Sequence, residues 1–232
     1  MTIMPDIWQT KMSKNSRSLH HTFSMTAKTE AIATLPRYRQ DIKEVRNKLE
    51  RKIFERSILG QLKKKSPWNY EHCLRVERLA VSIGKVLEVC GGELDDLAAA
   101  ARLHDVGKIR IPEKILEKPG SLTESEKEIM VMHAEYGYRI IDNSGLYNKT
   151  VMNAVREHHV HFTAMSGPTL LTEIIQAADC ADAMMMKRPY KAPMSRQKVI
   201  AEFEGNTMNM YREVIQIEEE NLRNSQTKEN YR

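Results

Sequence analysis

Histidine and aspartate side chains recur on the apolar faces of successive helical segments, and this pattern constrains the fold more than any other feature of the chain. His72 shares its face with Val76 and Leu79, and His133 shares another face with Ile140. Apolar residues at three- and four-residue steps predict amphipathic helices that bury one side. The chain must therefore fold so that imidazole and carboxylate groups converge inside a bundle of helices.

Five segments carry this pattern. Ser66 before Pro67 predicts the start of the first helix, and Thr123 with Glu126 predicts a capping box at the third. A lone histidine on an apolar face is more often a core residue than a ligand, but five such segments favour one shared site. Buried aspartate also needs a partner such as a cation. The candidate ligands are His72, His104, Asp105, His133, His158, His159 and Asp179.

The composition predicts an all-α fold. Aromatic residues make up 6% of the chain, strand signals are scarce, and helix-favouring residues are abundant. A hydrophobic content of 41% is sufficient for one buried core in 232 residues. We therefore expect a single helical bundle with appendages.

The basic charge of the chain lies in its front segment. Residues 1–66 hold 15 Lys or Arg and 6 Asp or Glu, a net charge of +9, whereas the remainder has a net charge of −4. The polar residues 1–28 are expected to form a disordered leader, and residues 29–66 a basic amphipathic helical segment. That segment could dock on the bundle, form a homo-oligomer through residues 37–58, or attract an acidic partner. Docking or dimerisation is favoured over nucleic-acid or membrane binding, because basic helix faces are commonly just solvated.

Two further observations bear on localisation. Cys73, Cys90 and Cys180 are widely spaced and form no disulfide framework, which fits a reducing cytoplasm. The longest apolar runs are far shorter than a membrane span, and no secretion signal is evident. The sequence therefore predicts a cytoplasmic protein. The front segment is too short for a typical sensor or receiver domain. If the chain is complete, we therefore expect a stand-alone protein without such a domain.

The ordered motifs resemble the HD superfamily of metal-dependent phosphohydrolases, and within it the HD-GYP cyclic dinucleotide phosphodiesterases. The resemblance is carried by the string from His104 to Lys108, by residues 109–120, and by the capping box at Thr123. It continues through His133, the His158-His159 pair, residues 178–183 and residues 188–191. It covers roughly residues 67–200 and implies an HD-domain helical bundle around a binuclear metal site.

The resemblance implies a role for each candidate. All seven candidate ligands would hold two metal ions, with Asp105 as the bridge, and Lys108 would offset the charge of the scissile phosphate. A hydroxide that bridges the metals would be the nucleophile, because coordination lowers the pKa of water. Imidazole and carboxylate ligands suit iron or manganese, although zinc, nickel and cobalt also accept them.

Two departures from the family pattern are specific. Trp68 stands where some relatives add a glutamate that helps to hold a third metal, so we expect two ions. The Gly-Tyr-Pro motif that follows the double histidine in the family is absent, and residues 160–168 form a shorter connection. Loops commonly set substrate choice, so the chemistry could persist while the preference for cyclic di-GMP changes.

Three residues beyond the ligands have two readings each. His161 could be an extra ligand or a proton donor, or it could be a solvated loop residue. Arg188 and Lys191 could bind the second phosphate of the substrate, or the Arg-Pro-Tyr-Lys string could simply end a helix.

The function expected from these motifs is metal-dependent hydrolysis of a phosphodiester in a cyclic dinucleotide, cyclic di-GMP or a related one. A nucleotide phosphomonoesterase with the same metals is the alternative among enzymes. A non-catalytic module that binds a nucleotide or a protein is the alternative among signalling proteins. The expected domains are the leader at 1–28, the basic helical segment at 29–66, the catalytic domain at 67–204, and a C-terminal helix with a frayed tail at 205–232.

Overall fold

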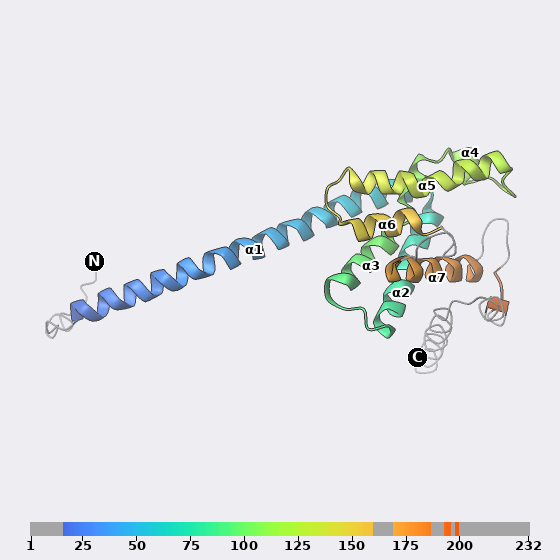
Figure 1. Ribbon diagram of the computed structural model, residues 1–232. Coiled ribbons are helices and arrows are strands. Elements are labelled where there is room, and N and C mark those ends of the chain that lie inside the picture. Colours follow the sequence, from blue (N-terminus) through green and yellow to red (C-terminus); the bar gives the residue numbers. More distant parts are fainter. Residues whose placement is uncertain (1–15, 160–168, 187–192, 196–197, 200–232) are drawn as a thin grey trace, which may run out of the picture. The chain divides into compact units, whose positions relative to one another are not determined.

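The computed structural model describes residues 16–159, 169–186, 193–195 and 198–199, and within these ranges it contains helices and no strand. This confirms the predicted all-α fold. None of the helices in the described ranges is both apolar enough and long enough to cross a lipid bilayer. The elements shown in Figure 1 are α1 (Ser16–Lys65), α2 (Pro67–Val86), α3 (Gly91–Leu103), η1 (Val106–Arg110), α4 (Glu113–Leu116), α5 (Glu124–Asp142), α6 (Lys149–Glu157) and α7 (Leu170–Met185).

The chain divides into two compact units, residues 1–51 and residues 52–232. In the first unit, α1 begins at Ser16, inside the segment expected to be a disordered leader. The helix extends this far because no glycine precedes Gly60, and the backbone hydrogen bond lost at Pro36 does not end it. Every residue from 38 to 49 in this unit is exposed.

The second unit begins before residue 67, the start expected for the catalytic domain. Ile58, Leu59 and Leu62 on the last turns of α1 are buried in the core of this unit. Lys65, the last residue of α1, also contacts this unit, because its Nζ donates to the carbonyl oxygen of Ile109 at 2.5 Å. The end of α1 thus belongs to the domain, since its apolar positions have buried partners there.

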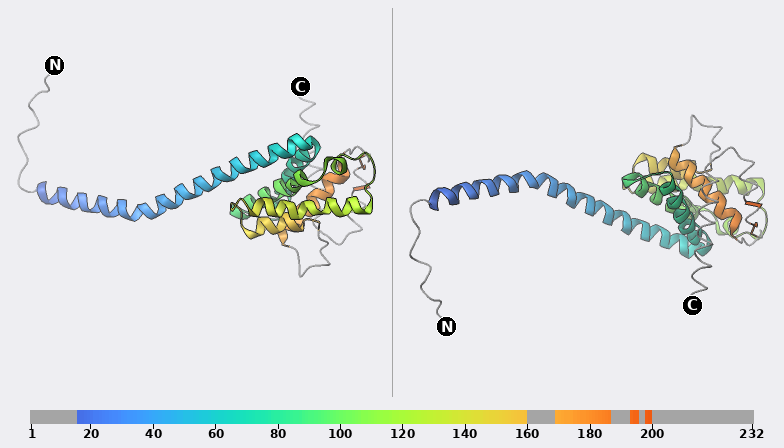
Figure 2. Two further views of the ribbon diagram at one scale, coloured as in Figure 1. Left: turned by 90° about the horizontal axis from the view of Figure 1, so that it is seen from above. Right: turned by 90° about the horizontal axis from the view of Figure 1, so that it is seen from below.

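The helices of the second unit pack around one core. Helix α2 contacts α3 and α7, while α6 contacts α3, α5 and α7, as the views in Figure 2 allow the reader to follow. The short helix η1 packs along α5. His72 on α2, His133 on α5 and His158 directly after α6 therefore lie around Asp105 in the turn between α3 and η1.

Local signals set where these helices begin. The Thr123 side chain accepts from the backbone N–H of Glu126, and the Glu126 side chain accepts from the backbone N–H of Thr123, which confirms the predicted capping box. Helix α2 follows Ser66 and has Pro67 in its first turn, as predicted, although the Ser66 side chain makes no capping bond. Thr169 and Asn148 cap α7 and α6 in the same way that Thr123 caps α5.

A glycine allows η1 to lie directly on α5. A β-carbon at Gly107 would lie 1.8 Å from the carbonyl oxygen of His133 and 2.5 Å from the backbone nitrogen of Gly137. No side chain fits in this space, and the obstacle is backbone that cannot move aside cheaply. The close approach brings the turn that carries Asp105 against the helix that carries His133.

Candidate metal centre

The seven candidate ligands come from five parts of the second unit. His72 lies on α2, His133 on α5 and Asp179 on α7, while His104 and Asp105 follow the end of α3, and His158 and His159 follow the end of α6. The structure brings them into two adjoining groups, and within each group the ligand atoms lie within 4.8 Å of one another. One group is Asp105, His133, His158 and His159, and the other is His72, His104 and Asp179.

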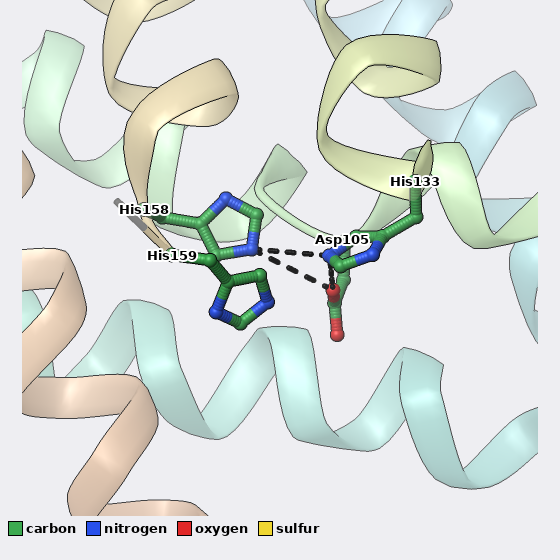
Figure 3. A group of neighbouring side chains, drawn as sticks. All are labelled: Asp105, His133, His158 and His159. Atoms are coloured by element: carbon green, nitrogen blue, oxygen red, sulfur yellow. Dashed lines mark hydrogen bonds and ion pairs between the residues drawn. The ribbon is translucent and has the colours of Figure 1, made fainter. Parts of the chain in front are cut away.

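The first group gathers three imidazole rings around one carboxylate (Figure 3). The Oδ1 atom of Asp105 lies 3.2 Å from Nε2 of His133 and 4.0 Å from Nε2 of His158. The ring of His159 lies 4.0 Å from the ring of His158, measured between centroids. His159 is exposed as a residue, but the packing of its ring lowers its pKa to about 4. The His159 ring is therefore neutral at physiological pH and has a nitrogen lone pair that can bind a metal ion.

Backbone carbonyl groups orient three of the histidines. The Nδ1 atoms of His104, His133 and His158 lie 2.5 to 2.8 Å from the carbonyl oxygen three residues earlier in the chain. A carbonyl can only accept, so each Nδ1 carries the hydrogen, and the neutral ring presents a lone pair on Nε2. Burial lowers the pKa of His104 and of His158, which keeps both rings neutral. This is the arrangement that metal-bound histidine requires.

The Nε2 atoms of His133 and His158 face each other, and neither carries a hydrogen to donate to the other. Nε2 of His133 and Nε2 of His158 lie 3.2 Å apart, while each Nδ1 already donates elsewhere. Nε2 of His104 and Oδ1 of Asp105 are buried and have no hydrogen-bond partner among the described residues. Unpaired acceptors at these positions are costly, and a shared cation would satisfy them. The residues therefore fit a metal ion.

The second group is built around His72. Its Nε2 lies 3.0 Å from Oδ1 of Asp179 and its Nδ1 lies 2.6 Å from Oδ2 of Asp182. Burial favours the neutral ring, but the hydrogen bonds to these two carboxylates outweigh it and raise the pKa of His72 to about 9. Nε2 of His72 and the Asp179 carboxylate thus face a common point that a proton or a metal cation can occupy.

Asp105 stands between the two groups. Its Oδ1 faces His133 and His158, whereas its Oδ2 lies 3.5 Å from Nε2 of His104 and 3.6 Å from Nε2 of His72. Burial disfavours the ionised carboxyl, but Lys108 and the surrounding histidines hold the pKa of Asp105 well below its usual range. An ionised carboxylate with one oxygen toward each group of donors is arranged as a bridging ligand.

Lys108 lies beside this bridge. Its Nζ donates to Oδ2 of Asp105 at 2.5 Å and to Oδ1 of Asn69 at 3.1 Å, and Asn69 in turn donates to Oγ of Ser66 at 2.8 Å. Burial alone would lower the pKa of Lys108 and favour its neutral form. The neighbouring Asp105 carboxylate outweighs burial and raises the pKa of Lys108, so the side chain stays cationic. Asn69 therefore helps to hold the ammonium group of Lys108 at the edge of the centre. Asn69 was not among the candidates that the sequence predicted.

Asp182 and Arg75 are the other site residues that the sequence candidates omit. Arg75 donates from Nε to Oδ1 of Asp182 at 2.6 Å and from Nη2 to Oδ2 at 3.0 Å. This fork holds the carboxylate that accepts from Nδ1 of His72. Asp182 lies three residues after Asp179 on α7, so the i, i+3 spacing of two aspartates on a buried helix face was the available signal.

We expect Asp182→Asn to weaken divalent-metal binding by about 10- to 100-fold, because the neutral amide no longer orients His72 through a charged acceptor. Metal affinity would be measured by competition with a chromogenic chelator. The control is Arg78→Ala on α2, the helix that carries His72, because the Nε of Arg78 donates to the nearby carbonyl oxygen of Leu74 and not to Asp182. Equal affinity in Asp182→Asn and the parent chain would show that Asp182 does not position His72.

Trp68 packs against the same histidine. Its ring stacks on His72 with a centroid distance of 5.3 Å and an interplanar angle of 11°. An indole ring offers no metal ligand, so the position that would carry the extra glutamate in some relatives contributes packing instead. This observation supports the expectation of two ions, although their number stays a prediction.

The remaining candidates lie outside the described residues. Arg188 and Lys191 fall in residues 187–192, and His161 falls in residues 160–168, the segment that replaces the Gly-Tyr-Pro loop. The expected C-terminal helix at 205–232 lies outside them as well. The roles suggested for these residues stay predictions.

This chain is similar in sequence to proteins of known family. Residues 69–184 match the family model described as HD domain. A cyclic di-GMP phosphodiesterase of Thermotoga maritima is 34% identical over 154 residues, which cover 61% of this chain and 41% of that protein. The 3'3'-cGAMP-specific phosphodiesterase 3 of Vibrio cholerae is 33% identical over 150 residues, which cover 61% of this chain and 32% of that protein.

A third relative is a cyclic di-GMP phosphodiesterase response regulator of Xanthomonas campestris pv. campestris, 34% identical over 141 residues. The match covers 54% of this chain and 36% of that protein. The chain thus spans less than half the length of each of these relatives. All seven candidate ligands lie within residues 69–184, the part of the chain that matches the family model.

Proposed function

This chain belongs to the HD domain family, and we propose that it is a metal-dependent phosphodiesterase that hydrolyses a cyclic dinucleotide. The relatives described above are named as phosphodiesterases of cyclic di-GMP and of 3'3'-cGAMP. The observation that carries the proposal is the position of Asp105, whose two carboxylate oxygens face two separate groups of metal-ligating side chains. A carboxylate in this position could contact both ions of a two-metal centre of the kind that hydrolyses phosphodiesters.

The proposed ligands divide between two ions. His133, His158 and His159 would hold one ion, His72, His104 and Asp179 would hold the other, and Asp105 would contact both. The set of five imidazoles and two carboxylates suits iron or manganese, and it does not select strongly against zinc, nickel or cobalt. When bound, such ions lower the pKa of water and so supply hydroxide at neutral pH, and they also neutralise phosphate charge.

The protein's own residues prepare this chemistry. Backbone carbonyls hold the imidazoles of His104, His133 and His158 in the tautomer that presents Nε2. Lys108 keeps a positive charge next to Asp105, at a position where it would stabilise the charge that develops on a phosphoryl group in the transition state. Asp105 is held ionised by Lys108 and the histidines and needs no proton removed before it binds metal.

The proposed substrate preference differs from that of relatives with a Gly-Tyr-Pro loop. Residues 160–168 of this chain include Val160, Phe162 and Met165 and offer fewer polar groups to fix a guanine base. We therefore expect weak or altered discrimination among cyclic dinucleotides, with Arg188 and Lys191 as candidate contacts to the second phosphate. A cyclic di-GMP preference above about a hundredfold, nearly 3 kcal/mol of transition-state discrimination, would show that specificity lies elsewhere.

The decisive experiment combines metal analysis with turnover. Chain purified without chelator, or reconstituted anaerobically with iron or manganese, should contain about two ions per chain and should hydrolyse a simple chromogenic phosphodiester. The same preparation would then be tested on cyclic di-GMP, cyclic GMP-AMP, cyclic di-AMP and their linear products. A chromogenic phosphomonoester, compared under one metal condition, would test the nucleotidase alternative.

The outcomes separate the alternatives. Chain that binds no metal after reconstitution contradicts the enzyme proposal, and three ions would show that Trp68 does not limit the number. Hydrolysis of the reporter without any cyclic dinucleotide means that the substrate class is wrong. Metal-loaded chain that cleaves neither reporter supports the non-catalytic binding module. Cytoplasmic localisation and the absence of nucleic-acid binding stay predictions from composition.

A further inference from the structure

We propose that the N-terminal part of α1 forms a parallel two-stranded coiled coil with a second copy of this chain. Four large apolar side chains on this part of the helix are strongly exposed: Tyr38 by 63%, Ile42 by 52%, Val45 by 67% and Leu49 by 57%. Single exposed apolar residues are normal on protein surfaces, but a row of four along one helix face marks a contact surface. We call these four residues the α1 seam.

The spacing of the α1 seam matches a heptad repeat. The steps of four, three and four residues place Tyr38 and Val45 at d positions and Ile42 and Leu49 at a positions. The sequence keeps this register toward the N-terminus with Leu35 at the preceding a position.

The number of apolar positions in each heptad indicates whether the α1 seam packs against another helix or against a globular domain. A helix that covers the core of its own domain needs a third apolar position in each heptad, and a stripe of a and d positions alone is typical of a coiled coil. Outward positions of the same segment are polar, including Gln40, Lys43 and Asn47. A second copy carries the identical seam and is therefore the complementary occupant.

Charges beside the seam favour parallel chains. Asp41 occupies a g position and Arg46 the e position five residues later, and in a parallel pair the g residue of one helix faces that e residue of the other. Two Asp41–Arg46 pairs would therefore form between the copies. The Arg46 side chain is 74% exposed and donates to Glu50 of its own helix at 2.8 Å, so its charge is accessible to a partner.

An antiparallel pair lacks this complementarity. In that orientation e positions face e positions, so that with the α1 seam in register Arg39 would lie beside the partner's Arg46. The attraction between Asp41 and the partner's Lys48 on the other side would be offset by this repulsion. The parallel arrangement contains the attractive pairs without a like-charge pair, and we commit to it.

Mass measurements test whether the pair forms. In sedimentation equilibrium at micromolar concentrations the parent chain should have twice its chain mass of 26.8 kDa. The double variant Ile42→Glu with Leu49→Glu should raise the dissociation constant by at least about a hundredfold, because it places four carboxylates in the seam of the dimer. The control is Gln40→Glu with Asn47→Glu, which adds the same charge on the outward face and should stay dimeric.

Cysteine cross-linking tests the orientation. In a parallel dimer each a residue meets its own copy, so Leu49→Cys should form an intermolecular disulfide at least about tenfold faster than Asn47→Cys. The parent chain gives the background from the native cysteines. A mixture of Leu49→Cys and Tyr38→Cys chains reports the antiparallel arrangement, in which these two positions meet.

Each outcome decides the proposal without reference to hydrolysis. A monomeric parent chain, a trimer, or a mass unaffected by glutamate in the α1 seam contradicts it. Equal cross-linking of Leu49→Cys and Asn47→Cys, or cross-linking only in the mixture with Tyr38→Cys, contradicts the parallel register. Circular dichroism of the variants would confirm that the helices persist, as expected for substitutions at exposed positions.

Discussion

Asp105→Ala is expected to reduce phosphodiester hydrolysis by at least about a thousandfold and to leave the chain unable to retain two metal ions. The reason is geometric, because Asp105 alone places one carboxylate oxygen toward each group of donors. Its removal would leave one ion with the imidazoles of His133, His158 and His159, and the other with His72, His104 and Asp179. Turnover of the chromogenic diester and elemental analysis of the same sample would be measured together.

Lys108→Ala separates chemistry from metal binding. Lys108 contacts Asp105 but is not a ligand in its cationic form, so this variant should keep about two ions and lose about 10²- to 10³-fold in turnover. Lys118→Ala is the matched control, since its ammonium group pairs with Glu126 away from the centre and should leave both quantities unchanged. Metal loss in Lys108→Ala as large as that in Asp105→Ala would assign Lys108 a structural role instead.

Gly107→Ala is expected to destabilise the second unit by at least about 3 kcal/mol, because the new methyl group would overlap the backbone of α5. The clash at 1.8 Å involves the carbonyl oxygen of His133, so η1 and α5 must separate and carry Asp105 away from His133. Denaturation of the chelator-treated chain in urea would measure the stability. Metal affinity, measured separately, should fall as well.

Gly60→Ala is the matched control for this substitution. Gly60 lies within α1, and a β-carbon there would meet no atom within 4 Å. Alanine should therefore stabilise the helix by about 0.5–1 kcal/mol through its higher helix propensity. If both alanine variants changed stability alike, the close approach of η1 to α5 would not be the cause.

Local sequence signals predicted most of the helices and the side chains that the structure brings together in the candidate metal centre. The capping box at Thr123 and Glu126 and the proline at position 67 depend on atoms only a few residues apart, so they could be read directly from the chain. The same is true of the inward-facing histidines, because the 3.6-residue period of a helix sets which side chains share its apolar face. These signals also favoured an all-helical bundle.

Other features depended on contacts that no local signal records. The leader was expected to lack structure because residues 1–28 are polar, yet a helix begins at Ser16. The end of α1 was assigned to a separate segment because its basic residues dominate the composition. Burial of Ile58, Leu59 and Leu62 against the other helices places those turns in the domain instead.

The sequence by itself determined which groups are available for metal binding and on which helix faces they lie, because side-chain chemistry and helical period are local properties. Only the tertiary structure decided that Asp105 divides its oxygens between two groups of donors and that Arg75 and Asp182 orient His72. The contact between His72 and Asp182 joins residues that are 110 positions apart in the chain. Such pairs form only when α2 and α7 pack side by side, and that packing is the joint result of all the buried faces of the bundle.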